Sequence, residues 1–205
     1  MTKVKICGIR RIEDALLAAD LGAMALGFIF WPQSPRYIDP SDVEPIAAAL
    51  PPFVTTVGVF VNQPAEFVKG VARQLHLGAV QLHGDEAVDD YAGAHRVIKA
   101  VAVAHDADAL AAVRAVSLRA TVLLDAHDPV RRGGTGRTID WTQAAEAARE
   151  RAIILSGGLH ADNVRAAIDT VRPYGIDVSS GVESTPGIKD PDKLRALFAA
   201  LEHES

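Results

Sequence analysis

Residues 3–30 read KVKICGIRRIEDALLAADLGAMALGFIF, and in this stretch two short apolar runs flank a helix-like segment. The first run, Lys3–Cys7, ends at Gly8, and the second covers Ala25–Phe30. Between them Ile12–Leu21 carries apolar residues at three- and four-residue spacing, which is typical of an amphipathic helix. The stretch therefore predicts a strand, a helix and a second strand, as in a parallel sheet.

The same alternation continues along most of the chain. Further β-like runs follow at Thr55–Val61, Ala79–Leu82, Val97–Val103, Thr121–Leu124, Ala152–Leu155 and Gly175–Ser179. Helix-like segments cover Glu66–Leu75, Ala107–Val116, Trp141–Arg149 and Lys193–Leu201, and another begins near Ala161.

Eight strands alternating with helices predict an α/β fold, a single closed (β/α)8 barrel over residues 1–205. Because such barrels typically have about 250 residues, we expect a compact one with trimmed loops and helices. A doubly wound open sheet is the alternative. That fold normally carries a glycine fingerprint after its first strand, which Gly8-Ile9-Arg10-Arg11 does not supply.

The composition excludes several classes of function. The 205 residues are 49% hydrophobic and 23% charged, as in an ordinary soluble globular protein. We expect neither a signal peptide nor a membrane span, and the single cysteine fits a reducing, cytoplasmic compartment without disulfides. The net charge of −5 argues against nucleic-acid binding but permits a small anionic substrate, since helix N-termini bind phosphate. The sequence leaves open whether the protein is a monomer or a homodimer.

Polar residues share one face of several predicted strands. Lys5 and Cys7 lie on one face of the first strand, and Lys99 and Asp177 hold comparable positions in the fifth and eighth. This face is predicted to point into the barrel. Because a buried charge is costly without a partner, we expect Asp177 to pair with Lys5 or Lys99.

Two reactive groups are predicted at the carboxyl ends of strands. Cys7 ends the first run, and Asp125 follows the apolar run Val122-Leu123-Leu124. Barrel enzymes place their active sites at this end of the strands, so the two groups would face one pocket. A base and an acid in that position are suited to proton transfer. The alternative is that Cys7 is merely a small buried apolar residue.

Two glycine turns follow the last two predicted strands. One contains Gly157 and Gly158, and the other contains Ser180 and Gly181. The loops after strands seven and eight of such barrels usually bind phosphate through backbone N–H groups. The alternative is that these glycines only make tight turns. A third glycine-rich loop, Arg131–Arg137, is interpreted as a lid over the pocket or as a solvated basic loop.

Arg36 and His83 are further candidate binding residues. Arg36 lies in a proline-restricted loop after the second strand, where it would hold a planar carboxylate, unless it is a solvated surface charge. His83 follows the fourth strand and is interpreted as a substrate contact or a satisfied interior group. The seven histidines are scattered, so a metal site formed by His83 and His127 is disfavoured, and no metal is expected.

Eight segments of the chain resemble phosphoribosylanthranilate isomerase. They are KICGIR, GFIFWPQSPRYI, VGVFVN, VQLHGDE, LLDA, GGTGRTIDW, LSGGLHADNV and DVSSGVESTPGIKD, in this order from Lys5 to Asp190. The resemblance implies a (β/α)8 barrel of L-tryptophan biosynthesis. It also implies an intramolecular aldose–ketose isomerase that converts N-(5-phosphoribosyl)anthranilate to 1-(2-carboxyphenylamino)-1-deoxyribulose 5-phosphate. That Amadori rearrangement uses no cofactor.

The resemblance also implies roles for individual residues. Cys7 would be the general base, Asp125 the general acid and Arg36 the partner of the anthranilate carboxylate. The phosphate would bind at the turns that contain Gly157, Gly158, Ser180 and Gly181. For this chemistry we expect Lys5 and a positive barrel mouth to lower the pKa of Cys7.

Two other functions are less well supported by the residues. A dual-substrate isomerase that also serves histidine biosynthesis would need an aspartate in place of Cys7. A barrel that binds a phosphorylated ligand without turning it over would have lost its base or its acid, and both are present here.

Overall fold

The computed structural model describes residues 2–91, 95–103, 108–126 and 140–202. Eight parallel strands form a closed barrel in chain order: β1 (Lys3–Cys7), β2 (Ala25–Ile29), β3 (Thr55–Phe60), β4 (Ala79–Leu82), β5 (Arg96–Val103), β6 (Ala120–Ala126), β7 (Ile153–Leu155) and β8 (Gly175–Val178). Strand β8 pairs with β1, which closes the barrel. The predicted barrel is confirmed, and the open-sheet alternative is wrong.

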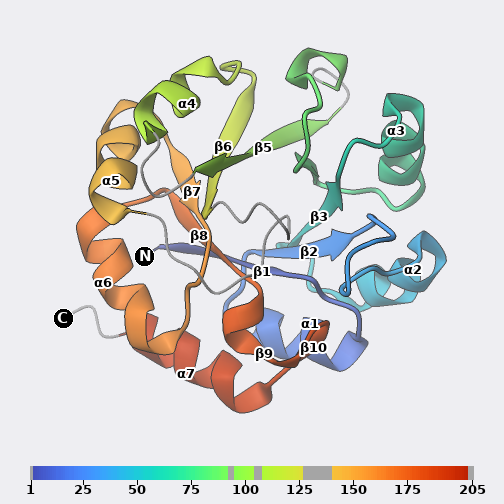
Figure 1. The fold of residues 1–205 in the computed structure, drawn as a ribbon. Helices are drawn as coiled ribbons and strands as arrows, with labels where there is room; N and C mark the ends of the chain where they lie inside the picture. The colour runs from blue at the N-terminus through green and yellow to red at the C-terminus, as the bar shows by residue number, and fades with distance from the viewer. Residues whose placement is uncertain (1, 92–94, 104–107, 127–139, 203–205) are drawn as a thin grey trace.

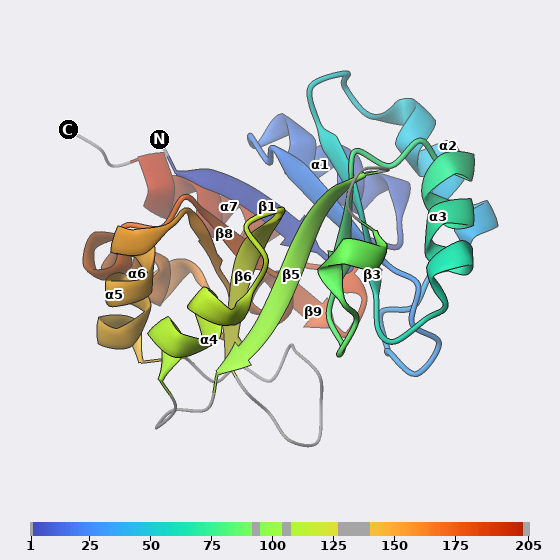
Figure 2. The ribbon, with the colours of Figure 1, turned by 90° about the horizontal axis from the view of Figure 1, so that it is seen from above.

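Helices surround the barrel on its outside, as Figures 1 and 2 show. They are α1 (Ile12–Asp20), α2 (Pro40–Ala49), α3 (Ala65–Gln74), α4 (Ala109–Ala115), α5 (Trp141–Glu150), α6 (Ala161–Val171) and α7 (Pro191–Glu202). Between β4 and β5 the described residues form only a short 3-10 helix, η1 (Val88–Asp90), in agreement with the expected trimming. Within the described ranges, no helix is long and apolar enough to cross a membrane.

Helix α2 is absent from the elements that the sequence predicts. It buries only Val43 and Ile46 and contains Pro45, so its apolar periodicity is weak. Its start is set instead by local chemistry, because the Asp39 carboxylate accepts a hydrogen bond from the backbone N–H of Ser41 at 2.9 Å. Pro40 at the first helical position adds to this signal.

The strands separate an outer apolar layer from a smaller inner one. Outward side chains of the strands pack with the helices in one large cluster, to which Val4, Ile6 and Leu124 belong. The inner cluster is formed by Ala100, Leu123 and Ile154, with Ile98 packed against it. The buried polar and charged residues of the eight barrel strands, among the residues that the structure describes, are Lys5, Gln81, Asp125 and Asp177. The interior of the barrel is therefore apolar in part and charged in part.

Only one of the two lysines expected inside the barrel lies there. Lys5 and Asp177 are partners in register, and the Lys5 ammonium lies 2.8 Å from the Asp177 carboxylate. Lys99 is instead the partner of Leu82, which packs in the outer cluster, and its Nζ donates to the Gly84 carbonyl at 2.6 Å. The interior positions of β5 are held by Ile98 and its alternate neighbours, so the prediction that Lys99 points inward is wrong.

A hairpin that the sequence does not predict follows β8. The 3-10 helix η2 (Ser180–Val182) leads into β9 (Glu183–Thr185), which pairs antiparallel with β10 (Ile188–Lys189). The backbone N–H of Lys189 donates to the Asp14 carboxylate of α1 at 3.1 Å, which holds the hairpin against the first helix. Helix α7 then begins two residues before the predicted segment Lys193–Leu201. The Asp190 carboxylate sets this start, since it accepts the N–H of Asp192 at 2.9 Å.

Candidate active site

The thiol of Cys7 lies inside the barrel at the carboxyl end of β1. The residue is 5% exposed and is the register partner of Gly27 on β2. A Cβ atom at Gly27 would lie 2.8 Å from Cys7 Sγ and 3.0 Å from Lys5 Nζ. The glycine on β2 therefore leaves the space that the thiol and the ammonium group share.

The pKa of Cys7 departs from its expected direction. Burial raises the pKa of the thiol. The positive charges of Lys5 and Lys189 lower this pKa, but by less than burial raises it. Asp177 opposes them, because its carboxylate neutralises Lys5 at 2.8 Å. The expectation of a lowered pKa is wrong, since the cation beside the thiol already has an anionic partner and both groups are removed from water.

We expect this shift to be visible in a direct titration. The chain has one cysteine, so the ultraviolet absorbance of the thiolate reports Cys7 without interference from another thiol. The absorbance should rise with pH at a midpoint above that of an ordinary cysteine, because burial disfavours the charged form. Subtracting the titration of Cys7→Ser removes the tyrosine signal. A midpoint below that of an ordinary cysteine would contradict the observed environment.

Asp125 lies inside the barrel at the carboxyl end of β6, in contact with His83. Asp125 is 4% exposed, and its Oδ2 lies 3.3 Å from His83 Nε2. Gln81 lies behind the imidazole, with its Nε2 3.1 Å from His83 Nδ1. When the Gln81 amide donates to Nδ1, the ring proton of neutral His83 is on Nε2, facing Asp125. His83 is thus placed to orient the Asp125 carboxyl group.

Arg36 crosses the backbone next to Cys7 rather than extending into solvent. Gly8 has a φ of +77°, and a Cβ atom there would lie 2.7 Å from Arg36 Cδ. Glycine at this position therefore allows both the turn after β1 and the passage of the arginine side chain. Arg36 is 8% exposed, so the alternative of a solvated surface charge is wrong.

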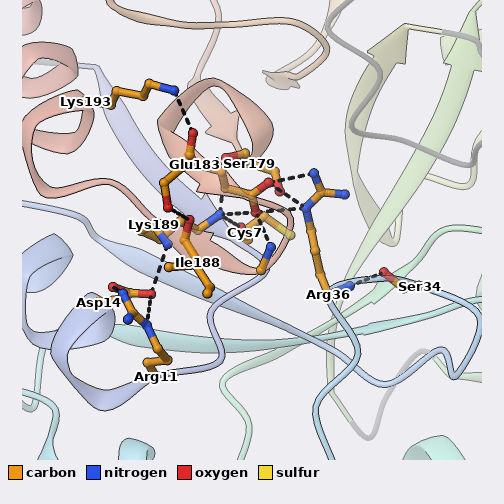
Figure 3. A network of polar contacts seen from close by, with 12 residues as sticks. Cys7, Arg11, Asp14, Ser34, Arg36, Ser179, Glu183, Ile188, Lys189 and Lys193 are labelled. Atoms are coloured by element: carbon orange, nitrogen blue, oxygen red, sulfur yellow. Dashed lines mark hydrogen bonds and ion pairs between the residues drawn. The ribbon is translucent and has the colours of Figure 1, made fainter.

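The guanidinium of Arg36 is held by Glu183 at the start of β9. Its Nε donates to Glu183 Oε1 at 2.9 Å, and its Nη2 donates to Oε2 at 2.7 Å (Figure 3). Among the described residues, no hydrogen bond engages Nη1. One edge of the guanidinium therefore has a protein partner, and the other remains able to bind an anion.

The two glycine turns after β7 and β8 lie against each other. A side chain at Gly181 would collide with the carbonyl group of Leu159, so the turns approach at van der Waals distance. Within the part of the chain that the structure describes, no acceptor engages the backbone N–H groups of Gly157, Gly158, Ser180 and Gly181. Four neighbouring unpaired donors form a suitable site for an anion.

The structure thus brings all eight predicted site residues to the carboxyl-terminal end of the barrel strands. His127 and the loop Arg131–Arg137 lie outside the described residues. Among residues 2–91, 95–103, 108–126 and 140–202, no group of three or more His, Cys, Asp or Glu side chains is placed to hold a metal ion. The geometry is that of a (β/α)8-barrel enzyme with its ionisable groups and glycine turns at the usual face.

Comparison with known proteins identifies the family. A family model described as N-(5'-phosphoribosyl)anthranilate (PRA) isomerase matches residues 4–200. The chain is 52% identical over 199 residues to the N-(5'-phosphoribosyl)anthranilate isomerase of Pelobacter propionicus, covering 97% of this chain and 94% of the relative. The chain therefore belongs to the phosphoribosylanthranilate isomerase family, as the sequence motifs predict.

Solved structures of the family share the fold. The crystal structure of phosphoribosyl anthranilate isomerase from Thermotoga maritima superposes with a TM-score of 0.90 at 45% identity, covering 98% of each chain. A second crystal structure of such an enzyme is a complex with reduced 1-(o-carboxyphenylamino)-1-deoxyribulose 5-phosphate. It superposes with a TM-score of 0.86 at 43% identity, again over 98% of each chain.

Sequence reasoning assigned no role to Glu183, Lys189 or Gly27, although all three shape the site. The side chains of Glu183 and Lys189 are 4% and 0% exposed, so they are an ion pair buried from solvent. Their signal in the sequence is weak, because a carboxylate and an ammonium group six residues apart in a loop are usually solvated. Gly27 carries no signal on its own, since its effect depends on the register of β2 against β1.

Proposed function

We propose that this chain isomerises N-(5-phosphoribosyl)anthranilate to 1-(2-carboxyphenylamino)-1-deoxyribulose 5-phosphate, a step of L-tryptophan biosynthesis. The observation that carries the proposal is the placement of Cys7 and Asp125 on the inner face of two strands that end at the same mouth, in a chain of this family. A thiol and a carboxyl group in that position supply the base and the acid that an aldose–ketose isomerisation needs.

The first chemical step opens the ribose ring. Asp125 gives its proton to the ring oxygen, the bond between C1 and that oxygen breaks, and the nitrogen lone pair of anthranilate forms the C=N bond of a protonated Schiff base. The contact with His83 at 3.3 Å supports this role, because it fixes the direction of the carboxyl group.

The second step moves the C2 proton. The thiolate of Cys7 removes it, and the electron pair of the C–H bond forms the C1=C2 bond of an enolamine while the iminium nitrogen becomes neutral. Protonation of C1 and loss of the C2 hydroxyl proton then give the ketone. Lys5 supports this step, since its ammonium lies beside the thiol and stabilises the thiolate while it exists.

Two anchors at opposite ends of the substrate complete the proposal. The unpaired N–H groups of the glycine turns bind the phosphate, and the free edge of Arg36 binds the anthranilate carboxylate. Both charges are present throughout the reaction, so these contacts hold the substrate without favouring the transition state.

A steady-state assay that follows the loss of phosphoribosylanthranilate fluorescence tests the proposal. We expect turnover without added metal or cofactor. The aminoaldose substrate of the related histidine-pathway isomerase serves as the second arm, and we expect no turnover of it. Phosphate binding without turnover of either compound would favour the alternative of a non-catalytic binding barrel.

Replacing Arg36 should separate anchoring from chemistry. Arg36→Ala loses a charge-assisted, two-pronged contact worth about 2–3 kcal/mol, so we expect KM to rise roughly 30- to 150-fold with a smaller change in kcat. Arg36→Lys should recover part of the affinity, because an ammonium group cannot reproduce the planar fork. Inhibition by inorganic phosphate, which reports the other end of the site, should stay at the parent value. An unchanged KM for Arg36→Ala would show that this loop does not bind the carboxylate.

A further inference from the structure

Three buried charged side chains form a group next to the carboxyl end of β1, where Lys189 contacts the Cys7 carbonyl. They are Arg36, Glu183 and Lys189, whose side chains are 10%, 4% and 0% exposed. Figure 3 shows Glu183 between the two cations, with Cys7 beside them. The three charges sum to +1, and a buried net charge is costly unless an anion balances it.

Lys189 joins this group to the backbone of the catalytic face. Its ammonium donates to the Cys7 carbonyl at 2.6 Å, to the Ser179 carbonyl at 3.2 Å and to Glu183 Oε1 at 2.9 Å. All three N–H bonds of the ammonium are therefore satisfied. Cys7 is the candidate base at the end of β1, and Ser179 follows β8 directly before the Ser180 turn. The Lys189 side chain therefore holds the ends of β1 and β8 together.

The Glu183 carboxylate accepts further hydrogen bonds besides the one from Lys189. Its Oε1 also accepts the backbone N–H of Gly187 at 3.2 Å, and its two oxygens accept Nε and Nη2 of Arg36. Burial alone would raise the pKa of this carboxyl, but the hydrogen bonds from Arg36 and the charge of Lys189 outweigh it, and the pKa lies below its ordinary value. Glu183 is therefore an anion with a fixed direction, to which Arg36 is bound by the edge formed by Nε and Nη2.

We propose that Glu183 and Lys189 are positioning residues that hold the free edge of Arg36 ready for a planar carboxylate. Glu183 orients the guanidinium, and Lys189 fixes Glu183 relative to the Cys7 and Ser179 backbone. A carboxylate on the free edge balances the charge of the group. This inference rests on the proposed function, in which Arg36 binds the anthranilate carboxylate, and it extends that function to two residues that do not touch the substrate.

Glu183→Gln is the first test, because it keeps the shape of the side chain and places an amide donor against the donors of Arg36. A guanidinium that is no longer oriented must be ordered when the substrate binds, so we expect KM to rise about five- to tenfold. We expect kcat and the inhibition constant of inorganic phosphate to stay near the parent values. Asp192→Asn is the matched control, since Asp192 is an exposed carboxylate of the same region, paired with Arg195, and should leave KM unchanged.

A double-variant cycle tests whether Glu183 acts through Arg36. If it does, Arg36→Ala with Glu183→Gln should have the KM of Arg36→Ala alone, because the residue to be positioned is gone. Additive effects of the two changes, or a KM for Glu183→Gln at or below the parent value, would overturn the inference. If Glu183→Gln does not fold, Glu183→Asp provides the same test, since its shorter carboxylate cannot reach Arg36 and Lys189 together and should show the same selective rise in KM.

The failure of this inference differs from the failure of the proposed function. When Arg36→Ala raises KM and Glu183→Gln does not, only the positioning role is overturned. When Arg36→Ala leaves KM unchanged, the carboxylate contact is absent and the positioning role falls with it, while the proposed isomerisation still stands. The proposed isomerisation falls only when the parent chain does not turn over phosphoribosylanthranilate.

Discussion

Cys7→Ser should abolish nearly all turnover while leaving substrate binding largely intact. An alcohol is far less acidic than a thiol, so the variant has no accessible anionic base at C2, and losing a general base costs about 10²- to 10⁴-fold in kcat. The substitution is nearly isosteric, and the space beside Gly27 and Lys5 accommodates the smaller oxygen. The measurement is kcat and KM by steady-state fluorescence. A Ser variant that kept more than about a tenth of the parent kcat would contradict the assignment.

Isotopic substitution shows which step the variant slows. If Cys7 removes the C2 proton, proton removal limits the rate in Cys7→Ser, and a substrate with deuterium at C2 should react measurably more slowly than the protiated one. Inhibition by inorganic phosphate should match that of the parent, which confirms that the glycine turns are intact. A C2-deuterium effect close to unity in this variant would mean that the thiol acts elsewhere in the reaction.

The fold was predictable because its signal is local and repeated. Each of the eight strands coincides with a short, mostly apolar run of the sequence, and β1 and β4 have the predicted bounds. Helix α2 was not predictable from periodicity, since only two of its residues are buried and its start depends on the Asp39 cap. The β9–β10 hairpin is too short to form a pattern, and its stability comes from contacts with α1 and β1 that are distant in sequence.

The position of the candidate site was predictable from the sequence, but its electrostatics were not. Strand ends and glycine turns place Cys7, Asp125 and the candidate anion site at one end of the barrel, because parallel strands present their carboxyl ends at one edge. A buried lysine partner for Asp177 was also predictable, since a buried charge needs a partner, but the sequence left Lys5 and Lys99 open and the structure selects Lys5. The raised pKa of Cys7 did not, because it depends on how burial compares with a cation that Asp177 already neutralises. The bond from Arg36 to Glu183 links residues 147 positions apart, which no local pattern reveals.

Asp125→Asn should reduce kcat by about 10²- to 10⁴-fold, because an amide cannot deliver the proton that opens the ribose ring. The amide has the shape of the carboxyl group and can keep the contact with His83 Nε2, so the interior of the barrel should stay folded. Its kinetic signature should be opposite to that of Cys7→Ser. Ring opening would limit the rate, and the C2-deuterium effect should fall towards unity since proton removal follows the slow step. A large C2-deuterium effect in Asp125→Asn, together with its absence in Cys7→Ser, would exchange the roles of the two residues.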